Sequence, residues 1–102
     1  SEVCFPRTLR VAIAYNNLGT AWYAAGEIDM AVDDYSEAIE VIEEIISESK
    51  EGHSQKVLIE QFKMYLNLGN TYCVAGDDIK NKRNRQRIQR VQQEIFNKVS
   101  VS

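Results

Sequence analysis

The sequence predicts an all-α protein. Apolar residues make up 44% of the 102 residues, which is enough for one domain with a modest core. The chain has one proline and five glycines, and no run of alternating apolar and polar residues marks a strand. Apolar residues instead recur at three- and four-residue steps, as in a helix that packs by one face. We therefore expect helices throughout.

The first predicted helix runs from about Pro6 to Ala25, with Pro6 or Thr8 near its start and Gly26 at its end. The helical period predicts that one face of this helix is apolar and packed. This face consists of Val11, Ala14, Tyr15, Leu18, Trp22 and Ala25.

The second predicted helix runs from about Glu27 to Ser49. It carries nine carboxylates, and those at its start suit the helix dipole. Its apolar stripe consists of Ile28, Ala31, Val32, Tyr35, Ala38, Ile39, Ile42 and Ile46.

A polar loop over residues 47–54 is predicted to separate the second helix from a third. Ser54 can cap the third helix, which reaches Ala75 and is closed by Gly76. A fourth helix is predicted from about Asp78 to Val99. The sequence thus predicts four helices.

An internal repeat of fifty residues relates the two halves of the chain. Residues 15–27 (YNNLGTAWYAAGE) align with residues 65–77 (YLNLGNTYCVAGD), with six identities. Gly26 and Gly76 follow helix ends, where a left-handed backbone conformation turns the chain. Gly19 and Gly69 lie in mid-helix, where glycine costs roughly 0.5–1 kcal/mol relative to alanine. We expect them to allow close approach of a neighbouring helix backbone.

The first half resembles the tetratricopeptide repeat. The family pattern has an aromatic residue, Leu-Gly, a second aromatic residue and then Ala-x-x-x-aromatic. The residues that carry the resemblance are Tyr15, Leu18, Gly19, Trp22, Gly26, Ala31, Tyr35 and Ala38. The first helix of the motif recurs at Tyr65, Leu68, Gly69, Tyr72 and Gly76. The resemblance covers about residues 8–99 and implies two stacked antiparallel helix hairpins, with one full and one degenerate repeat.

Two departures from the family pattern stand out. The repeat length is fifty residues rather than 34, which resembles the long-helix variants of the Pins-like polarity adaptors and kinesin light chains. In the second repeat Asn81, Arg85 and Ile88 replace the small and aromatic residues, so the fourth helix is not expected to pack in the usual way over its first half. Three arrangements of the fourth helix remain open: it packs by its C-terminal half, it acts as a polar terminal cap, or its apolar stripe packs against a second chain. The candidate self-association residues are Ile88, Val91, Ile95 and Val99.

The resemblance also implies a binding groove lined by the first helix of each repeat. In the family, asparagines matching Asn17 and Asn67 hold peptide ligands, and a side-chain amide offers two donors and an acceptor. Ile13 stands where a lysine would grip an acidic C-terminus, which disfavours a chaperone-tail clamp. The alternative is that these asparagines only solvate the surface. The candidate groove residues are Ile13, Asn16, Asn17, Thr20, Ala24, Lys63, Leu66, Asn67, Asn70 and Val74.

Charge is distributed unevenly along the chain. Residues 1–51 hold three basic and eleven acidic groups, whereas residues 52–102 hold nine basic and four acidic groups. The basic run 80–90 (KNKRNRQRIQR) lacks interleaved aromatics, which favours a solvated helix face over a nucleic-acid site. It could also lie beside the acidic second helix, within the chain or in another copy.

No catalytic or metal-binding constellation is present in the sequence. His53 stands alone in the polar loop, and Asp77 and Asp78 are typical of a helix start rather than of acid–base chemistry. Cys4 and Cys73 form no C-x-x-C pair, which favours reduced thiols in the cytoplasm. We expect no enzyme activity, no cofactor, no metal and no membrane partner.

Residues 1–102 are predicted to form one domain, with repeats over about 8–49 and 55–99. Because three repeats are usually needed for a continuous core, the chain is either cut from a longer array, which its start at Ser1 allows, or self-associates. The leading hypothesis is a non-enzymatic adaptor or scaffold that binds a peptide or helical segment of a partner protein. Self-association as a homo-oligomer is the alternative, and nucleic-acid binding is the third.

Overall fold

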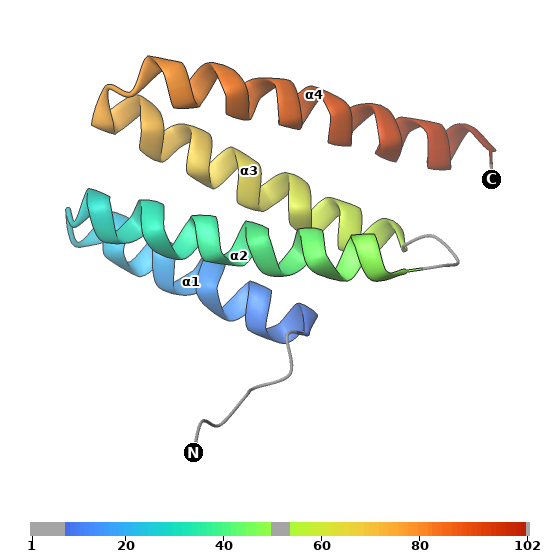
Figure 1. The fold of residues 1–102 in the computed structure, drawn as a ribbon, viewed down its shortest axis with the longest axis horizontal. Helices are drawn as coiled ribbons and strands as arrows, with labels where there is room; N and C mark the ends of the chain where they lie inside the picture. The colour runs from blue at the N-terminus through green and yellow to red at the C-terminus, as the bar shows by residue number, and fades with distance from the viewer. Residues whose placement is uncertain (1–7, 50–53, 102) are drawn as a thin grey trace.

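The computed structural model describes residues 8–49 and 54–101, and this part of the chain folds into four helices. The helices are α1 (Leu9–Ala24), α2 (Ile28–Glu48), α3 (Gln55–Ala75) and α4 (Asp78–Val101). Helices α1 and α2 form one antiparallel hairpin, and α3 and α4 form a second hairpin stacked on the first (Figure 1). The predicted all-α fold of stacked hairpins is confirmed.

The helix ends follow from local side-chain and backbone chemistry. The Thr8 hydroxyl accepts a hydrogen bond from the backbone N–H of Val11 at 3.4 Å, and the Ser54 hydroxyl accepts from that of Val57 at 3.3 Å. Gly26 and Gly76 have φ values of +82° and +74°, in the left-handed region that glycine enters without steric cost. These four ends were predicted within one or two residues.

Two boundaries differ from the sequence prediction. Helix α2 ends at Glu48, one residue before the predicted Ser49, so residues 47 and 48, which the sequence assigned to both the helix and the loop, are helical. Helix α4 continues to Val101 rather than Val99. Pro6, Cys4 and His53 lie outside the described residues.

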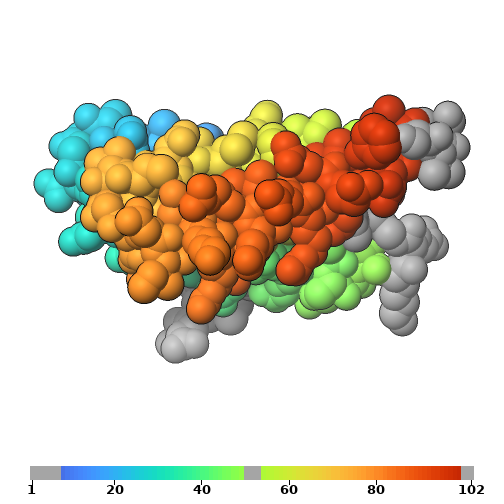
Figure 2. Space-filling view, turned by 90° about the horizontal axis from the view of Figure 1, so that it is seen from above, coloured from blue at the N-terminus to red at the C-terminus, as the bar shows by residue number. Residues whose placement is uncertain are grey.

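The core lies where α1, α2 and α3 meet, and α4 adds the buried side chain of Val91 to it. The largest fully buried side chains are those of Val41, Ile42, Leu58, Met64 and Thr71. In the space-filling view, α4 crosses the face of the molecule, with α3 along one edge and α2 along the other (Figure 2). The two hairpins therefore share one core.

The predicted apolar face of α1 is partly wrong. Ala12 and Gly19 are buried, whereas Ala14 is exposed and Leu18 is 46% exposed. Residues 11–15 are apolar without a break, so the period alone does not select the side that α2 and α3 cover. In α2, Val41 is fully buried although it lies outside the predicted stripe.

The mid-helix glycines do permit close approach, but the approaching groups are side chains rather than backbone. A Cβ atom at Gly19 would lie 2.7 Å from Cδ1 of Tyr35, and one at Gly69 would lie 3.1 Å from Nδ2 of Asn84. Glycine at each position leaves room for a side chain of the second helix of the same hairpin.

Helix α4 packs against α3 from its first turns, through asparagine side chains. The Asn84 amide donates to the backbone carbonyl of Tyr65 at 2.8 Å, and the Asn81 amide donates to Sγ of Cys73 at 3.1 Å. Ile88, Val91 and Ile95 continue the contact toward the C-terminus. Packing by the C-terminal half alone is therefore wrong, because polar side chains fill the first half.

Tyr65 joins α3 to α2 through a buried phenol. Its hydroxyl donates to Oε2 of Glu43 at 2.6 Å. Burial raises the pKa of Tyr65 well above its usual value, and the hydrogen bond to Glu43 and the negative charge of Glu43 raise it further, while the positive charge of Arg87 acts in the opposite direction. The folded state therefore favours the neutral phenol.

This raised pKa predicts a loss of stability at alkaline pH. Below about pH 10 the Tyr65 phenol is neutral in both the folded and the unfolded chain, so its contribution to the free energy of unfolding is fully present. Above that pH the phenol ionises first in the unfolded chain, and this contribution falls. We expect the stability advantage of the wild type over Tyr65→Phe to shrink as pH rises from 8 to 11 in urea unfolding. A difference that stays constant across this range would contradict the assignment.

Candidate functional site

A set of polar side chains lies together where α1 and α3 run side by side. Asn16 and Thr20 come from α1, and Asn67 and Asn70 come from α3. We call these four residues the amide surface. All four belong to the groove predicted from the sequence, and the helical period places each pair on one side of its helix.

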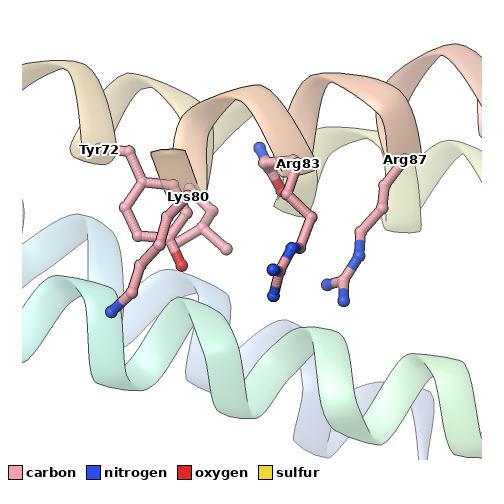
Figure 3. Close-up of a pocket in the computed structure, with 6 residues that line it drawn as sticks. Tyr72, Lys80, Arg83 and Arg87 are labelled. Carbon is pink, nitrogen blue, oxygen red and sulfur yellow. The ribbon is translucent and has the colours of Figure 1, made fainter. Parts of the chain in front are cut away.

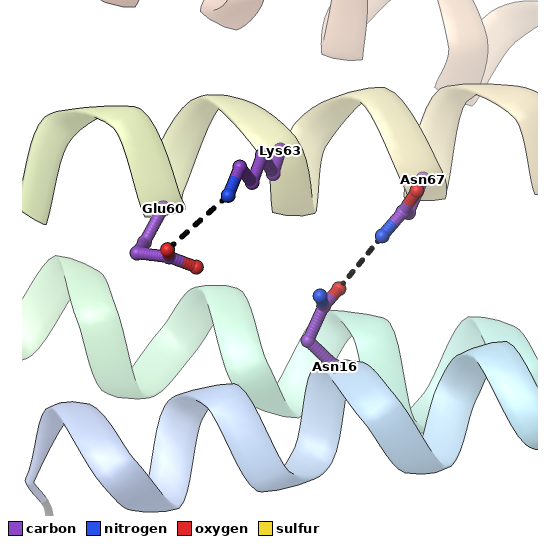
Figure 4. A network of polar contacts seen from close by, with 4 residues as sticks. All are labelled: Asn16, Glu60, Lys63 and Asn67. Carbon is purple, nitrogen blue, oxygen red and sulfur yellow. Dashed lines mark hydrogen bonds and ion pairs between the residues drawn. The ribbon is translucent and has the colours of Figure 1, made fainter. Parts of the chain in front are cut away.

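Hydrogen bonds connect the amide surface across the two helices. The Asn67 amide donates from Nδ2 to Oδ1 of Asn16 at 3.0 Å (Figure 4). The Thr20 hydroxyl donates to the backbone carbonyl of Asn16 at 3.1 Å and also bonds the hydroxyl of Tyr35 at 2.9 Å. Hydrogen bonds within the chain thus fix Asn16, Thr20 and Asn67, three of the four residues of the amide surface.

An open hollow of about 180 Å³ lies beside this network. Its lining residues are Thr20, Tyr23, Tyr35, Asn67 and Asn70. Tyr23 and Tyr35 were not among the predicted groove residues. Tyr35 reaches the hollow because Gly19 leaves room for its ring. The sequence signal for this contact between α1 and α2 was the Leu-Gly pair followed by Ala-x-x-x-aromatic.

The remaining predicted groove residues occupy several environments. Ile13 packs against the core, and Lys63 forms an ion pair with Glu60 at 3.4 Å (Figure 4). The exposed members of the set are Asn17, Ala24, Leu66 and Val74. The structure therefore brings four of the predicted groove residues together as the amide surface, whereas the others pack on the core, form an ion pair or are exposed.

The four residues predicted for self-association are not equally accessible. Val91 is 4% exposed, and Ile88 and Ile95 pack against the same core. Val99 is 59% exposed and has exposed Phe96 near it in sequence. Three of the four thus contact the chain's own core, and Val99 remains at the surface.

Neither a metal-binding cluster nor a membrane-spanning helix is found among residues 8–49 and 54–101. No group of three or more His, Cys, Asp or Glu side chains is placed to hold a metal ion in this part of the chain. None of the described helices is both long enough and apolar enough to cross a membrane. Asp77 starts α4, because its Oδ1 accepts from the backbone N–H of Lys80 at 3.1 Å.

Comparison with known proteins identifies the first hairpin. The family model described as tetratricopeptide repeat matches residues 12–44. No curated protein and no solved structure matches the chain. The matched segment covers most of α1 and α2, including Gly19 and Tyr35, and tetratricopeptide repeats are in general protein-interaction modules. Residues 12–44 of the chain are therefore similar to the tetratricopeptide repeat.

Proposed function

We propose that the chain binds an extended segment of a partner protein along the amide surface, as an adaptor or scaffold. The observation that supports this most directly is the bond between Asn67 and Asn16, which fixes two amides from neighbouring helices beside an open hollow. An extended peptide presents alternating N–H and carbonyl groups, and it needs donors and acceptors held in place.

The amide surface has hydrogen-bonding capacity left after its internal bonds are made. Each asparagine offers two donor hydrogens and an acceptor oxygen. The Asn16–Asn67 bond uses one donor of Asn67 and occupies the acceptor of Asn16, which leaves Oδ1 of Asn67 and the amide group of Asn16 for a ligand. Exposed Leu66 and Val74 on α3 add apolar contacts for ligand side chains.

We expect Asn67→Ala with Asn70→Ala to weaken binding of a selected peptide by about tenfold or more, since two hydrogen bonds contribute roughly 0.5–1.5 kcal/mol each. Peptides would be selected from a random phage-displayed library on the immobilised wild-type chain. Their dissociation constants would then be measured by fluorescence anisotropy.

The matched control is Asn97→Ala, which removes an exposed asparagine amide from α4. It should bind the selected peptides as the wild type does. Equal affinity of the double variant and the wild type for every selected peptide would exclude the amide surface as the binding site.

Self-association through the C-terminal end of α4 is the second proposal. Phe96 and Val99 are both exposed there, and exposed large apolar side chains close together favour an interface. The proposal is confined to this end of α4, because Val91 is buried within the chain.

A further inference from the structure

A second hollow, distinct from the amide surface, lies between α3 and α4 on the side that faces α2 (Figure 3). Its volume is about 170 Å³. We call its lining residues the basic pocket; they are Leu68, Tyr72, Lys80, Arg83, Asn84 and Arg87. The proposed peptide site uses none of these residues.

Three cationic side chains extend into this space from one side of α4. Lys80, Arg83 and Arg87 follow each other at three- and four-residue steps and point toward α2 (Figure 3). Lys80 lies 3.9 Å from Asp77, at the limit of an ion pair. Neither arginine has a carboxylate within 4.0 Å among the residues that the structure describes. The two arginines thus have no ion-pair partner among the described residues, and positive charge of this kind favours the binding of an anion.

Asn84 adds an unsatisfied polar atom to the wall of the pocket. Its side chain is 3% exposed, and its amide nitrogen is fixed by the carbonyl of Tyr65 at 2.8 Å. Its Oδ1 atom is buried and has no hydrogen-bond partner in the described part of the chain. Buried polar atoms nearly always have a partner, so the hydrogen bonding of this wall of the pocket is incomplete.

We propose that the basic pocket binds a phosphate group carried on a side chain of a protein segment. A phosphorylated side chain carries about −1.5 to −2 charges at pH 7, which suits three cations better than the single charge of a carboxylate. Guanidinium groups bond phosphate oxygens in pairs, which lysine cannot do. A volume of about 170 Å³ is below the roughly 300 Å³ at which pockets for larger molecules begin, so one phosphate with its short linker is the suitable occupant.

A protein segment fits the surroundings better than a nucleic acid does. The pocket opens toward α2, and residues 27–49 hold nine acidic and no basic residues. A strand with a phosphate at every nucleotide would bring further negative charges toward these carboxylates, whereas a peptide with one phosphate would not.

The test uses the whole chain and fluorescein-labelled pools of nine-residue peptides with a central phosphoserine and randomised flanks. Fluorescence anisotropy should show saturable binding at least tenfold tighter than that of the same pools with unmodified serine. Arg83→Gln with Arg87→Gln should weaken this binding at least tenfold. Both side chains are exposed, so the double variant is expected to fold, and its circular dichroism melting curve checks this.

The matched control is Lys82→Gln with Arg85→Gln, which removes the same charge from α4 outside the pocket. It should change the affinity for the phosphopeptide pools less than twofold. Equal losses in the two double variants would overturn the proposal in favour of diffuse attraction. Inorganic phosphate that binds as tightly as the pools, or a six-nucleotide single-stranded RNA that binds more tightly, would also overturn it, as would no preference for phosphoserine.

Discussion

Val91→Lys is expected to lower the free energy of unfolding by about 3–5 kcal/mol, because it places an ammonium group without a counter-ion in the core. Val91 is 4% exposed and belongs to the core cluster with Met64, Tyr65 and Leu68. A domain of this size is stable by about 5–15 kcal/mol, so the variant should lose a large part of its stability. Urea unfolding followed by circular dichroism measures the change.

Val99→Lys is the matched control, since it makes the same replacement on the same helix at a side chain that is 59% exposed. Its effect should lie within about 0.5 kcal/mol of the wild type. Similar losses in the two variants would show that α4 does not pack on α3 as described. If the end of α4 mediates self-association, light scattering should also show that Val99→Lys shifts the wild-type chain toward the monomer without unfolding it.

The sequence predicted the helix ends well because the signals are local. Thr8 and Ser54 cap helices through backbone groups three residues away, and Gly26 and Gly76 turn the chain at their own positions. None of these interactions depends on how the helices later pack.

The buried sides of the helices were harder to predict, because they depend on neighbouring helices. Residues 11–15 are apolar throughout, so only the position of α2 and α3 decides that Ala12 is buried and Ala14 exposed. The fifty-residue alignment pairs Tyr35 with Arg85, yet Asn84 faces Gly69. This one-residue shift turns α4 about its axis, and the internal repeat gave no sign of it.

The candidate site was predicted as a surface but not as a network. Helical spacing placed Asn16, Thr20, Asn67 and Asn70 on one side of their helices. The sequence paired Asn17 with Asn67 as equivalent residues, whereas the observed bond joins Asn16 to Asn67. The stagger between α1 and α3 decides which asparagines meet, and it results from packing rather than from the repeat.

Gly19→Ala is expected to lower the free energy of unfolding by about 2 kcal/mol, although alanine is the better helix former. The new Cβ atom would lie 2.7 and 2.8 Å from two ring atoms of Tyr35. That ring is buried and its hydroxyl bonds Thr20, so it has little freedom to move. Overpacking of this kind costs roughly 1–3 kcal/mol, which exceeds the gain of roughly 0.5–1 kcal/mol in helix propensity.

Gly69→Ala provides the comparison within the same chain. Its Cβ atom would lie 3.1 Å from the amide nitrogen of Asn84, which needs to shift by only a few tenths of an ångström. We expect a change of less than about 1 kcal/mol in either direction, since a small clash opposes the gain in helix propensity. Urea unfolding of both variants compares the effects at the two glycines. If Gly19→Ala raised the free energy of unfolding, Tyr35 would not pack over α1 as it does in the structure. The contact with the Tyr35 ring of α2 would then not be the reason for a glycine at position 19.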